Sequence, residues 1–240
     1  PAREAIISRH EGGYILEGDY SQLEFRVAGF LSKDPVIYEE VASGFDVHSY
    51  TASIMGVSRQ DAKAHTFKPL YGGVLGTNRE MAYYSAFRDK YKAVTEWHEK
   101  LQDEAVDTKK VVLPSGREYS FPYAKYTSRG TAVGATSIKN YPVQGFATAD
   151  LLPLALIRLH KSLKAMIQPK AKSKIINTVH DSIVMDVHPD EKEQMVYLMK
   201  ESMLCIPKEC SEKFGIDFDM PIDIELKIGQ DWLNLEEITT

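Results

Sequence analysis

The sequence predicts an α+β fold that is mostly helical and contains a small antiparallel sheet. Near the start, the apolar run Tyr14–Leu16 indicates a short buried strand, and the residues after it recur at helical spacing. In residues 175–187, two apolar runs flank a polar tip, which is the pattern of a β-hairpin. Helical spacing dominates elsewhere, so we expect four or five strands among many helices.

Length and composition describe an ordinary globular chain. Its 240 residues suffice for one large domain or two small ones, and 43% are hydrophobic while 26% are charged. The net charge of −5 argues weakly against a nucleic-acid coat protein, but it permits an enzyme whose site is lined locally by Lys and Arg. No apolar run approaches the roughly 20 residues that span a bilayer, so we expect no membrane partner.

The start of the chain and its two cysteines carry limited information about its processing and its compartment. The chain begins Pro-Ala-Arg-Glu, without an initiator Met or a signal peptide, which predicts a fragment or a processed chain. Cys205 and Cys210 form no zinc pattern with a nearby His, so we expect two thiols in a reducing compartment.

The first strand runs into the segment Gly18-Asp19-Tyr20-Ser21-Gln22-Leu23-Glu24 and then into a helix. Asp19 therefore stands where a rigid strand ends, which suits a hard divalent cation that prefers oxygen ligands. By itself such an aspartate is more often a cap or turn residue. A second candidate, Asp181, occupies the tip of the downstream hairpin. Two strand-borne aspartates in one sheet would hold two metal ions for phosphoryl transfer.

The next segments predict short helices. Lys33-Asp34-Pro35 breaks the chain, residues 35–42 form a helix that ends at Gly44, and Asp46 caps another that ends near Gly56. A variant capping box, Ser58-Arg59-Gln60-Asp61, begins a helix in which every fourth residue forms one winding stripe. The stripe consists of Arg59, Lys63, Phe67 and Tyr71, and Pro69 is expected to kink the helix. A solvated basic face followed by core aromatics is the simpler interpretation of this stripe.

The rest of the chain continues the α+β pattern. Residues 77–107 predict one long helix with Met81 and Trp97 in the core, and residues 110–122 predict a hairpin with its turn at Pro114-Ser115-Gly116. Residues 125–134 predict a polar loop, residues 146–167 an apolar helix, residues 190–214 a helix and residues 221–228 a closing strand. Asp186 alternates with apolar residues of its strand, so we expect it on the surface and not as a third metal ligand.

Nucleotidyl transfer needs metal ions and cationic side chains, because charge neutralisation dominates that chemistry. Asp19 and Asp181 are the metal candidates, and Arg59, Lys63 and His48 are the phosphate candidates. The aromatic residues further along the stripe, Phe67 and Tyr71, are placed to stack on a base.

Together these segments resemble family A DNA polymerases, the family of bacterial DNA polymerase I and many phage replicases. Asp-Tyr-Ser-Gln-Leu-Glu at 19–24 resembles motif A, the Arg59 stripe with Gly72 resembles motif B, and Val179-His180-Asp181 resembles motif C. Asp46-Val47-His48 and Asn140-x-Pro142-x-Gln144-Gly145 match two further family segments in the right order. The resemblance covers residues 3–232. Any one motif is weak, but five in order are very specific.

The resemblance implies a role for each matched residue. Asp19 and Asp181, with the backbone carbonyl of Tyr20, would bind two Mg²⁺ ions, for which Mn²⁺ could substitute. Glu24 would be the steric gate that excludes a ribose 2′-hydroxyl. Lys63 would bind phosphate and protonate the pyrophosphate. The remaining nucleotide contacts would be Arg59, His48, Phe67, Tyr71 and Gln22, and the primer–template contacts would be Asn140, Gln144, His180 and Tyr71.

The resemblance also implies the architecture and the partners. Residues 1–32 and 140–240 would form the palm and residues 33–139 the fingers, while the thumb and any exonuclease domain are absent. An N-terminal portion in the same or a separate chain would supply them. Primer–template DNA and deoxynucleotides would be the ligands, and the location would be the cytoplasm, that of the host if a phage encodes the protein.

Two departures from the family pattern bear on this interpretation. Ser182 follows the motif C aspartate where the family often has Glu, which removes an accessory carboxylate. Motif B reads Thr66-Phe67-Lys68-Pro69-Leu70, where bacterial members usually have Asn-Phe-Gly without proline, and this looks phage-like.

Three alternatives remain open at this point. A single-subunit phage-type RNA polymerase shares the palm and a His-Asp-Ser motif, although it lacks a bulky gate such as Glu24. A metal phosphohydrolase would need further His ligands, and the histidines here are scattered. A DNA-binding subunit that retains the fold without activity, and that needs an N-terminal portion, is the third.

Overall fold

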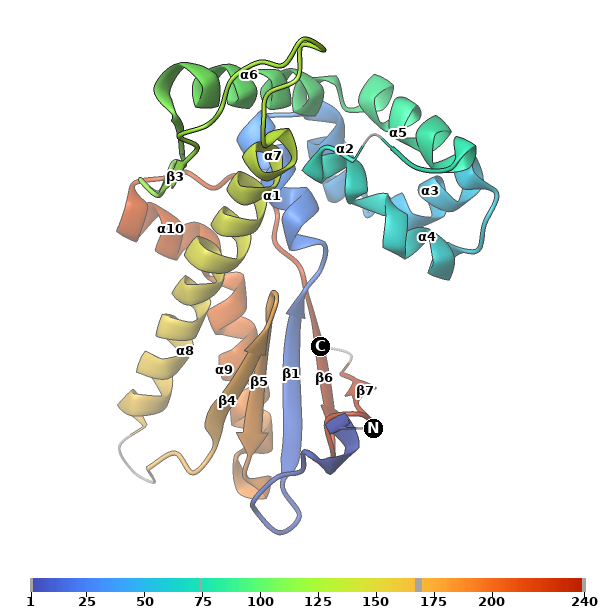
Figure 1. Ribbon diagram of the computed structural model, residues 1–240. Coiled ribbons are helices and arrows are strands. Elements are labelled where there is room, and N and C mark those ends of the chain that lie inside the picture. Colours follow the sequence, from blue (N-terminus) through green and yellow to red (C-terminus); the bar gives the residue numbers. More distant parts are fainter. Residues whose placement is uncertain (1, 74, 167–169, 239–240) are drawn as a thin grey trace. The chain divides into compact units, whose positions relative to one another are not determined.

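The computed structural model describes residues 2–73, 75–166 and 170–238, which pack as two units (Figure 1). The described parts of segments 1–23, 147–218 and 222–240 form the first, here called the sheet unit. Segments 24–146 and 219–221 form the second, the helical unit. The predicted α+β class is confirmed, and the predicted palm and fingers bounds stay a prediction, because the units are defined by packing alone.

The sheet unit is built around β1 (Tyr14–Tyr20), which lies between two antiparallel neighbours. The strand order is β4-β5-β1-β6-β7, and every pairing in this sheet is antiparallel. The other strands are β4 (Lys174–Val179), β5 (Ser182–Val187), β6 (Ile224–Gly229) and β7 (Glu236–Glu237). The predicted closing strand and the predicted hairpin are thus both present.

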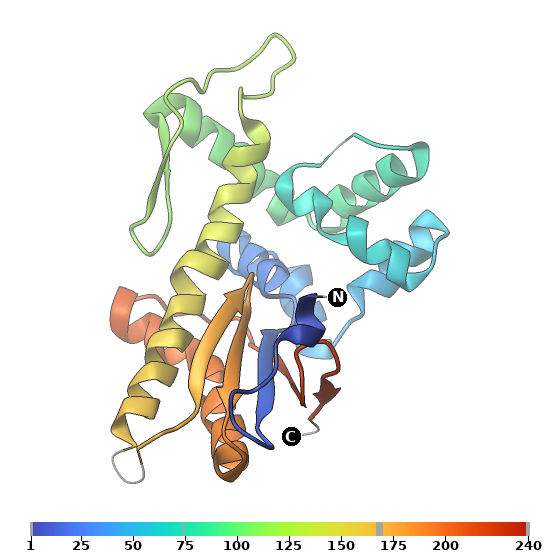
Figure 2. The same cartoon turned by 60° about the horizontal axis from the view of Figure 1, so that its bottom comes forward.

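Helices cover this sheet. The helix α9 (Lys192–Leu204) packs against β1 and β6, and it lies on one face of the sheet (Figure 1, Figure 2). Its buried face carries Met195, Met199 and Met203. A Cβ at Gly18 would lie 2.6 Å from Sδ of Met203, so glycine permits this close approach of helix and strand. The other helical segments are η1 (Ala2–Ala5), η3 (Gly145–Leu151, π-helical), α8 (Leu152–Ala165), η4 (Pro189–Glu191) and α10 (Ile206–Phe214).

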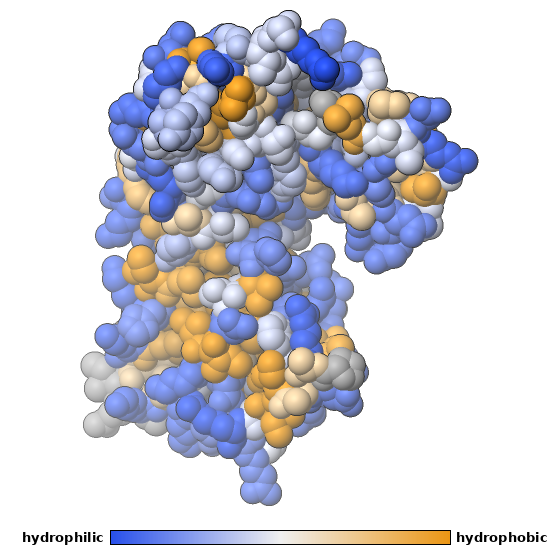
Figure 3. Space-filling view, viewed as in Figure 1, coloured by the Kyte–Doolittle hydropathy of each residue, from blue (hydrophilic) through white to orange (hydrophobic). Residues whose placement is uncertain are grey.

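The edge strand β4 is much more exposed than its neighbour β5. All six residues of β5 are buried, whereas four of the six in β4 are exposed. Figure 3 shows apolar side chains at the surface over α8 and β4, where Ile157 and Ile176 are 46% and 44% exposed. The β4 edge of the sheet is therefore largely exposed.

Asp186 corrects a prediction, because it is buried and not on the surface. Its strand is covered on both faces, so alternation along the sequence does not indicate exposure here. The carboxylate accepts a hydrogen bond of 2.6 Å from Ser8 Oγ and lies 3.1 Å from Arg9 Nε. The N-terminal segment thus supplies the partners that a buried carboxylate needs.

The helical unit holds most of the helices and one small hairpin. Its buried aromatic centre consists of Phe25, Tyr83, Tyr84, Phe87 and Tyr91. The elements are α1 (Leu23–Ser32), α2 (Pro35–Ser43), α3 (Val47–Met55), α4 (Arg59–Thr66), η2 (Lys68–Tyr71), α5 (Asn78–Lys90), α6 (Lys92–Thr108), β2 (Lys110–Val112), β3 (Glu118–Ser120) and α7 (Ala135–Gln144). None of the helices in the described ranges combines the length and apolar character needed to cross a bilayer.

Several predicted helices are divided in the structure. The predicted helix 77–107 breaks at Tyr91, and Met81, predicted in the core, is 40% exposed. The predicted helix 190–214 breaks at Cys205, just before Pro207. The stripe helix does not kink at Pro69 but ends at Thr66, and a 3₁₀ turn follows. Proline has no N–H for the helix ladder, so the tighter turn replaces a kinked helix.

Asp34 links two helices of this unit through one buried carboxylate. Its Oδ1 accepts from the backbone N–H groups of Val36 and Ile37, which caps α2. Its Oδ2 accepts from the N–H groups of Ala93 and Val94, at the start of α6, at 3.0 and 3.3 Å. The side chain is thus an N-cap for two helices that are distant in sequence.

We predict that Asp34→Ala lowers the free energy of unfolding by about 3 kcal/mol, because four helix-terminal N–H groups lose their acceptor. Urea denaturation of the purified chain measures this. Asp34→Asn retains one acceptor oxygen and should lose about half as much. An alanine variant as stable as the unmodified chain would contradict this role.

Candidate functional site

Asp19 and Asp181 lie side by side in the sheet unit. Asp19 is in register with Ser182, the first residue of β5, and Asp181 directly precedes that residue. The two carboxyl groups share a hydrogen bond. The residues are 162 positions apart in the sequence, and the antiparallel pairing of β1 with β5 brings them together.

The hairpin turn that presents Asp181 is short. Only His180 and Asp181 separate β4 from β5. His180 has a φ of 55°, a backbone conformation that side chains other than glycine adopt at a cost. The two-residue turn fixes the position of Asp181 beside the end of β1.

The surroundings of the pair are acidic. Glu17 lies on the same face of β1 as Asp19, and Glu225 is the residue of β6 directly opposite Asp19. Burial, followed by the charge of Asp181, raises the pKa of Asp19 well above its ordinary value. Lys227 is a nearby counter-charge, and its Nζ lies 2.9 Å from Glu225. Because two neighbouring carboxylates repel each other, Asp19 and Asp181 favour either a shared proton or a bound cation.

The residues present fit a magnesium site of the kind completed by substrate. Two carboxylates suffice for Mg²⁺ when phosphates and water supply the other ligands. Within residues 2–73, 75–166 and 170–238, no group of three or more His, Cys, Asp or Glu side chains is arranged to hold a metal. Tyr20 directs its hydroxyl to the carbonyl of Met203, at 2.8 Å, so its side chain is occupied in the core.

In the helical unit, Asp46 positions two of the predicted phosphate-binding residues. Its carboxylate caps α3 by accepting from the N–H groups of His48 and Ser49. The same carboxylate accepts from Nε of Arg59, at 2.7 Å, and this hydrogen bond lowers the pKa of Asp46. Lys63 lies one turn along α4 from Arg59 and is exposed.

His48 also contacts the aromatic part of the stripe. Its Nδ1 is 3.0 Å from Oγ1 of Thr66, and its ring lies edge-on to Phe67 with centroids 5.3 Å apart. Phe67 in turn packs against Phe25, at 5.8 Å. His48, Arg59 and Phe67 therefore form one cluster, here called the α3–α4 cluster.

The other predicted residues lie on α1, η2, α7 and the segment before α1. Tyr71 ends η2 and is half-buried, and Asn140, in α7, has a buried Oδ1 without a hydrogen-bond partner among the described residues. Glu24 is half-buried in the first turn of α1, and Gln144 is the last residue of α7. Gln22 precedes α1 with a φ of 54°.

Sequence reasoning missed three contributors to these sites. Glu17 and Glu225 create the acidic field around Asp19. Asp46 was predicted only as a helix cap, although it also holds Arg59. The two-residue spacing of Glu17 and Asp19, which places both on one strand face, could have indicated the contribution of Glu17. The Asp46–Arg59 contact depends on how α3 and α4 pack.

We predict that His48 is neutral at pH 7, because burial and then the positive charge of Arg59 lower its pKa. Arg59→Gln should raise the pKa of His48, since it removes a cation and frees Asp46, whose charge stabilises the protonated ring. NMR titration of the His48 ring measures both. The matched control is Lys161→Gln, on α8 of the sheet unit, which should leave the midpoint unchanged. A midpoint in Arg59→Gln at or below that of the unmodified chain would refute this electrostatic account.

Comparison with known proteins shows that the chain belongs to a known family. The sequence model of "DNA polymerase family A" matches residues 1–234. DNA polymerase I of Lactococcus lactis subsp. cremoris is 31% identical, over 96% of this chain and 27% of its own length. The thermostable DNA polymerase I of Thermus thermophilus is 30% identical over 98% of this chain and 29% of its own length. The chain thus spans less than a third of either relative.

A solved structure shares the fold. The POL domain of Pol1 from M. smegmatis, in complex with DNA primer-template and dNTP, superposes with a TM-score of 0.76 at 23% identity. The match covers 96% of this chain and 42% of that one.

Proposed function

Because this chain belongs to DNA polymerase family A, we propose that it is the catalytic part of a template-directed DNA polymerase that adds deoxynucleotides to a primer 3′-hydroxyl. The observation that carries the proposal is the Asp19–Asp181 pair, which lies at the ends of adjacent strands in an acidic environment. Primer–template DNA and deoxynucleoside triphosphates are the proposed ligands.

Asp19 and Asp181 would hold two Mg²⁺ ions, or Mn²⁺ in their place, together with the backbone carbonyl of Tyr20. When bound, such ions neutralise phosphate charge and favour ionisation of the primer hydroxyl. The pair supports this role because its two carboxyl groups lie close enough to share a hydrogen bond. When both are ionised they repel each other, and a bound cation relieves that repulsion. Lys227 and its partner Glu225 would then frame the site without occupying it.

The α3–α4 cluster would bind the triphosphate. Arg59 and Lys63 supply fixed positive charge, and Lys63 would donate the proton that pyrophosphate needs on leaving. His48, held by Thr66, would donate one hydrogen bond from its other ring nitrogen. Phe67 would pack against the sugar and the base, because its ring is fixed between His48 and Phe25.

The remaining residues would select and align the substrates. Glu24 would exclude a 2′-hydroxyl, Tyr71 would support that gate, and Gln22 would contact the nucleotide. Asn140, Gln144 and His180 would contact the primer–template.

The wider assignment concerns the parent protein. We propose that residues 1–32 and 140–240 act as palm and residues 33–139 as fingers, with a thumb and exonuclease portion N-terminal in the same or a separate chain. The motif B sequence Thr66-Phe67-Lys68-Pro69-Leu70 supports a phage-like replicative polymerase. The relatives named above are bacterial.

We predict that Asp181→Asn lowers the rate of primer extension by about a thousandfold or more, equivalent to ~4 kcal/mol, because one of two cation ligands is lost. The assay uses Mg²⁺ and a labelled primer–template, with and without an added N-terminal portion. The variant should unfold at the same or a higher urea concentration than the unmodified chain, since it removes a like-charge contact.

The control for this experiment is Asp217→Asn, which changes an exposed carboxylate in the sheet unit and should keep full activity. Robust extension by Asp181→Asn would refute the catalytic assignment. Absence of extension by the unmodified chain in both arms would favour a DNA-binding subunit instead.

We predict that Glu24→Ala increases incorporation of ribonucleotides relative to deoxynucleotides by at least about tenfold, because a steric exclusion worth ~1–3 kcal/mol is removed. Single-nucleotide kinetics with both substrate types measure the ratio. Glu39→Ala, at an exposed position of α2, is the matched control. An unchanged ratio contradicts the gate, and a preference of the unmodified chain for ribonucleotides favours the RNA polymerase alternative.

A further inference from the structure

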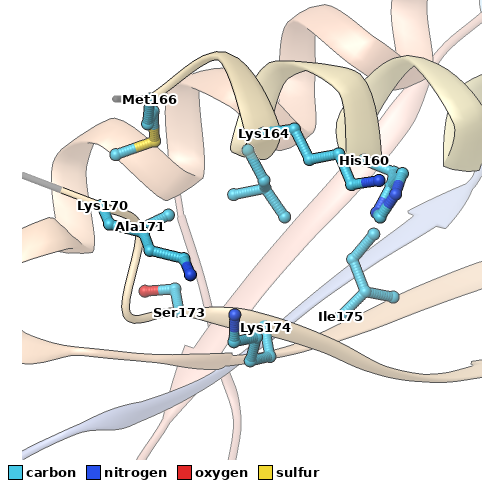
Figure 4. A pocket seen from close by; sticks show the side chains of 9 residues that line it. His160, Lys164, Met166, Lys170, Ala171, Ser173, Lys174 and Ile175 are labelled. Carbon is cyan, nitrogen blue, oxygen red and sulfur yellow. The ribbon is translucent and has the colours of Figure 1, made fainter. Parts of the chain in front are cut away.

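The sheet unit contains a cationic pocket that none of the roles above uses. It lies between the end of α8 and the start of β4 and has a volume of about 410 Å³. His160 and Lys164 come from the helix, Lys170 comes from the segment that leads into the strand, and Lys174 is the first residue of the strand. Figure 4 shows these side chains around one hollow, with Lys170 and Lys174 on one side and Lys164 and His160 on the other. No carboxylate is among the described residues that line it.

The positive charge of this region is unusual for an acidic chain. Residues 151–180 contain neither Asp nor Glu, although the whole chain has 34 acidic and 29 basic residues. The segment carries Arg158, Lys161, Lys164, Lys170, Lys172 and Lys174. Slightly more than a fifth of the basic residues thus lie in an eighth of the chain. Such a concentration attracts an anionic ligand even when the net charge is negative.

The lysines of the pocket lack the partners that nearby basic residues have. Arg158 pairs with Glu209 at 3.5 Å, and Lys172 pairs with Asp190 at 3.8 Å. No described carboxylate forms an ion pair with Lys164, Lys170 or Lys174, and all three are exposed. Buried Ser173 adds a polar group to the wall, although its hydroxyl is bonded to Glu191. The uncompensated charge is therefore concentrated on the pocket itself.

The strand β4 connects this pocket to the carboxylate pair. Lys174 is its first residue, and Asp181 follows its last residue by two positions. At about 3.3 Å per residue the separation is roughly 20 Å. The side chains between include the exposed polar residues Asn177 and Thr178, on a strand that forms the edge of the sheet among the described residues. Successive phosphates of one DNA strand lie about 3.4 Å apart along the helix axis, so roughly six nucleotides span this distance.

We propose that the α8–β4 pocket binds backbone phosphates of the nucleic-acid duplex, about six nucleotides from the end that lies at Asp19 and Asp181. This inference rests on the proposed function, because the duplex end must sit at that pair. Lysines on flexible stems suit phosphate charge without base readout. The pocket is larger than a single phosphate group requires, and its basic residues come both from α8 and from residues 170–174. These two features favour several linked phosphates of a nucleic-acid backbone over one free phosphate ion.

The test compares Lys170→Gln/Lys174→Gln with the charge-matched control Lys208→Gln/Lys213→Gln, which changes two exposed lysines of α10. Fluorescence anisotropy measures binding of a labelled primer–template without metal ions or nucleotides. For a duplex of about 12 base pairs, we expect the pocket variant to bind about tenfold more weakly at low salt. Its plot of log affinity against log salt should be shallower by about two. A duplex of about four base pairs ends before the pocket and should bind both variants equally.

Three outcomes would overturn the proposal. In the first, the pocket variant binds the long duplex as tightly as the control does. In the second, the pocket variant loses affinity equally for both duplex lengths. In the third, inorganic phosphate at millimolar concentration displaces the labelled duplex as well as unlabelled duplex does. If a polyglutamate peptide binds the unmodified chain but not the pocket variant, while DNA affinity is unchanged, the site serves an acidic polypeptide instead. Since the readout needs no chemistry, its failure is distinct from failure of the Asp181→Asn assay, which tests the proposed function.

Discussion

The antiparallel pairing of β1 with β5 is the constraint on which the candidate site depends. It places the ends of two strands side by side, and each end carries an aspartate. Two carboxyl groups at this distance repel each other when ionised, so the arrangement lowers stability unless a proton or a cation is shared. The surrounding sheet tolerates this, because β1 is hydrogen-bonded on both sides and packed against the methionines of α9. A site of this type is held by backbone, and its side chains need little support of their own.

Two carboxylates of the helical unit cap helices and join them to neighbouring elements. Asp34 joins the starts of α2 and α6, and Asp46 caps α3 while holding Arg59. In both cases one side chain accepts hydrogen bonds from two elements, so helices that are short and weakly stable alone are fixed to one another. The cationic residues of the α3–α4 cluster thus acquire defined positions on short helices. Since Arg59 is exposed, its contact with Asp46 positions the side chain more than it stabilises the fold.

Local chemistry accounts for what was predicted correctly. The hairpin at residues 175–187 and the helix starts at Asp34, Asp46 and Ser58 are encoded by alternation, capping residues and proline, which act within a few residues. The errors arose where packing overrides periodicity. Asp186 is buried because the N-terminal segment covers it. The helix at residues 77–107 breaks at Tyr91, whose ring is buried in the aromatic centre and whose hydroxyl donates to Glu40. Met81 shares the spacing of core residues but faces outward.

The sequence by itself determined the family, the α+β class and the identity of the matched motif residues, because short motifs in a fixed order are properties of the chain alone. It also determined where several helices begin, since caps act locally. Only the tertiary structure decided that Asp19 meets Asp181 among other carboxylates, that Asp46 holds Arg59, and that the lysines of residues 164–174 surround one hollow. Those contacts depend on strand register and helix packing, which bring together residues that no local pattern connects.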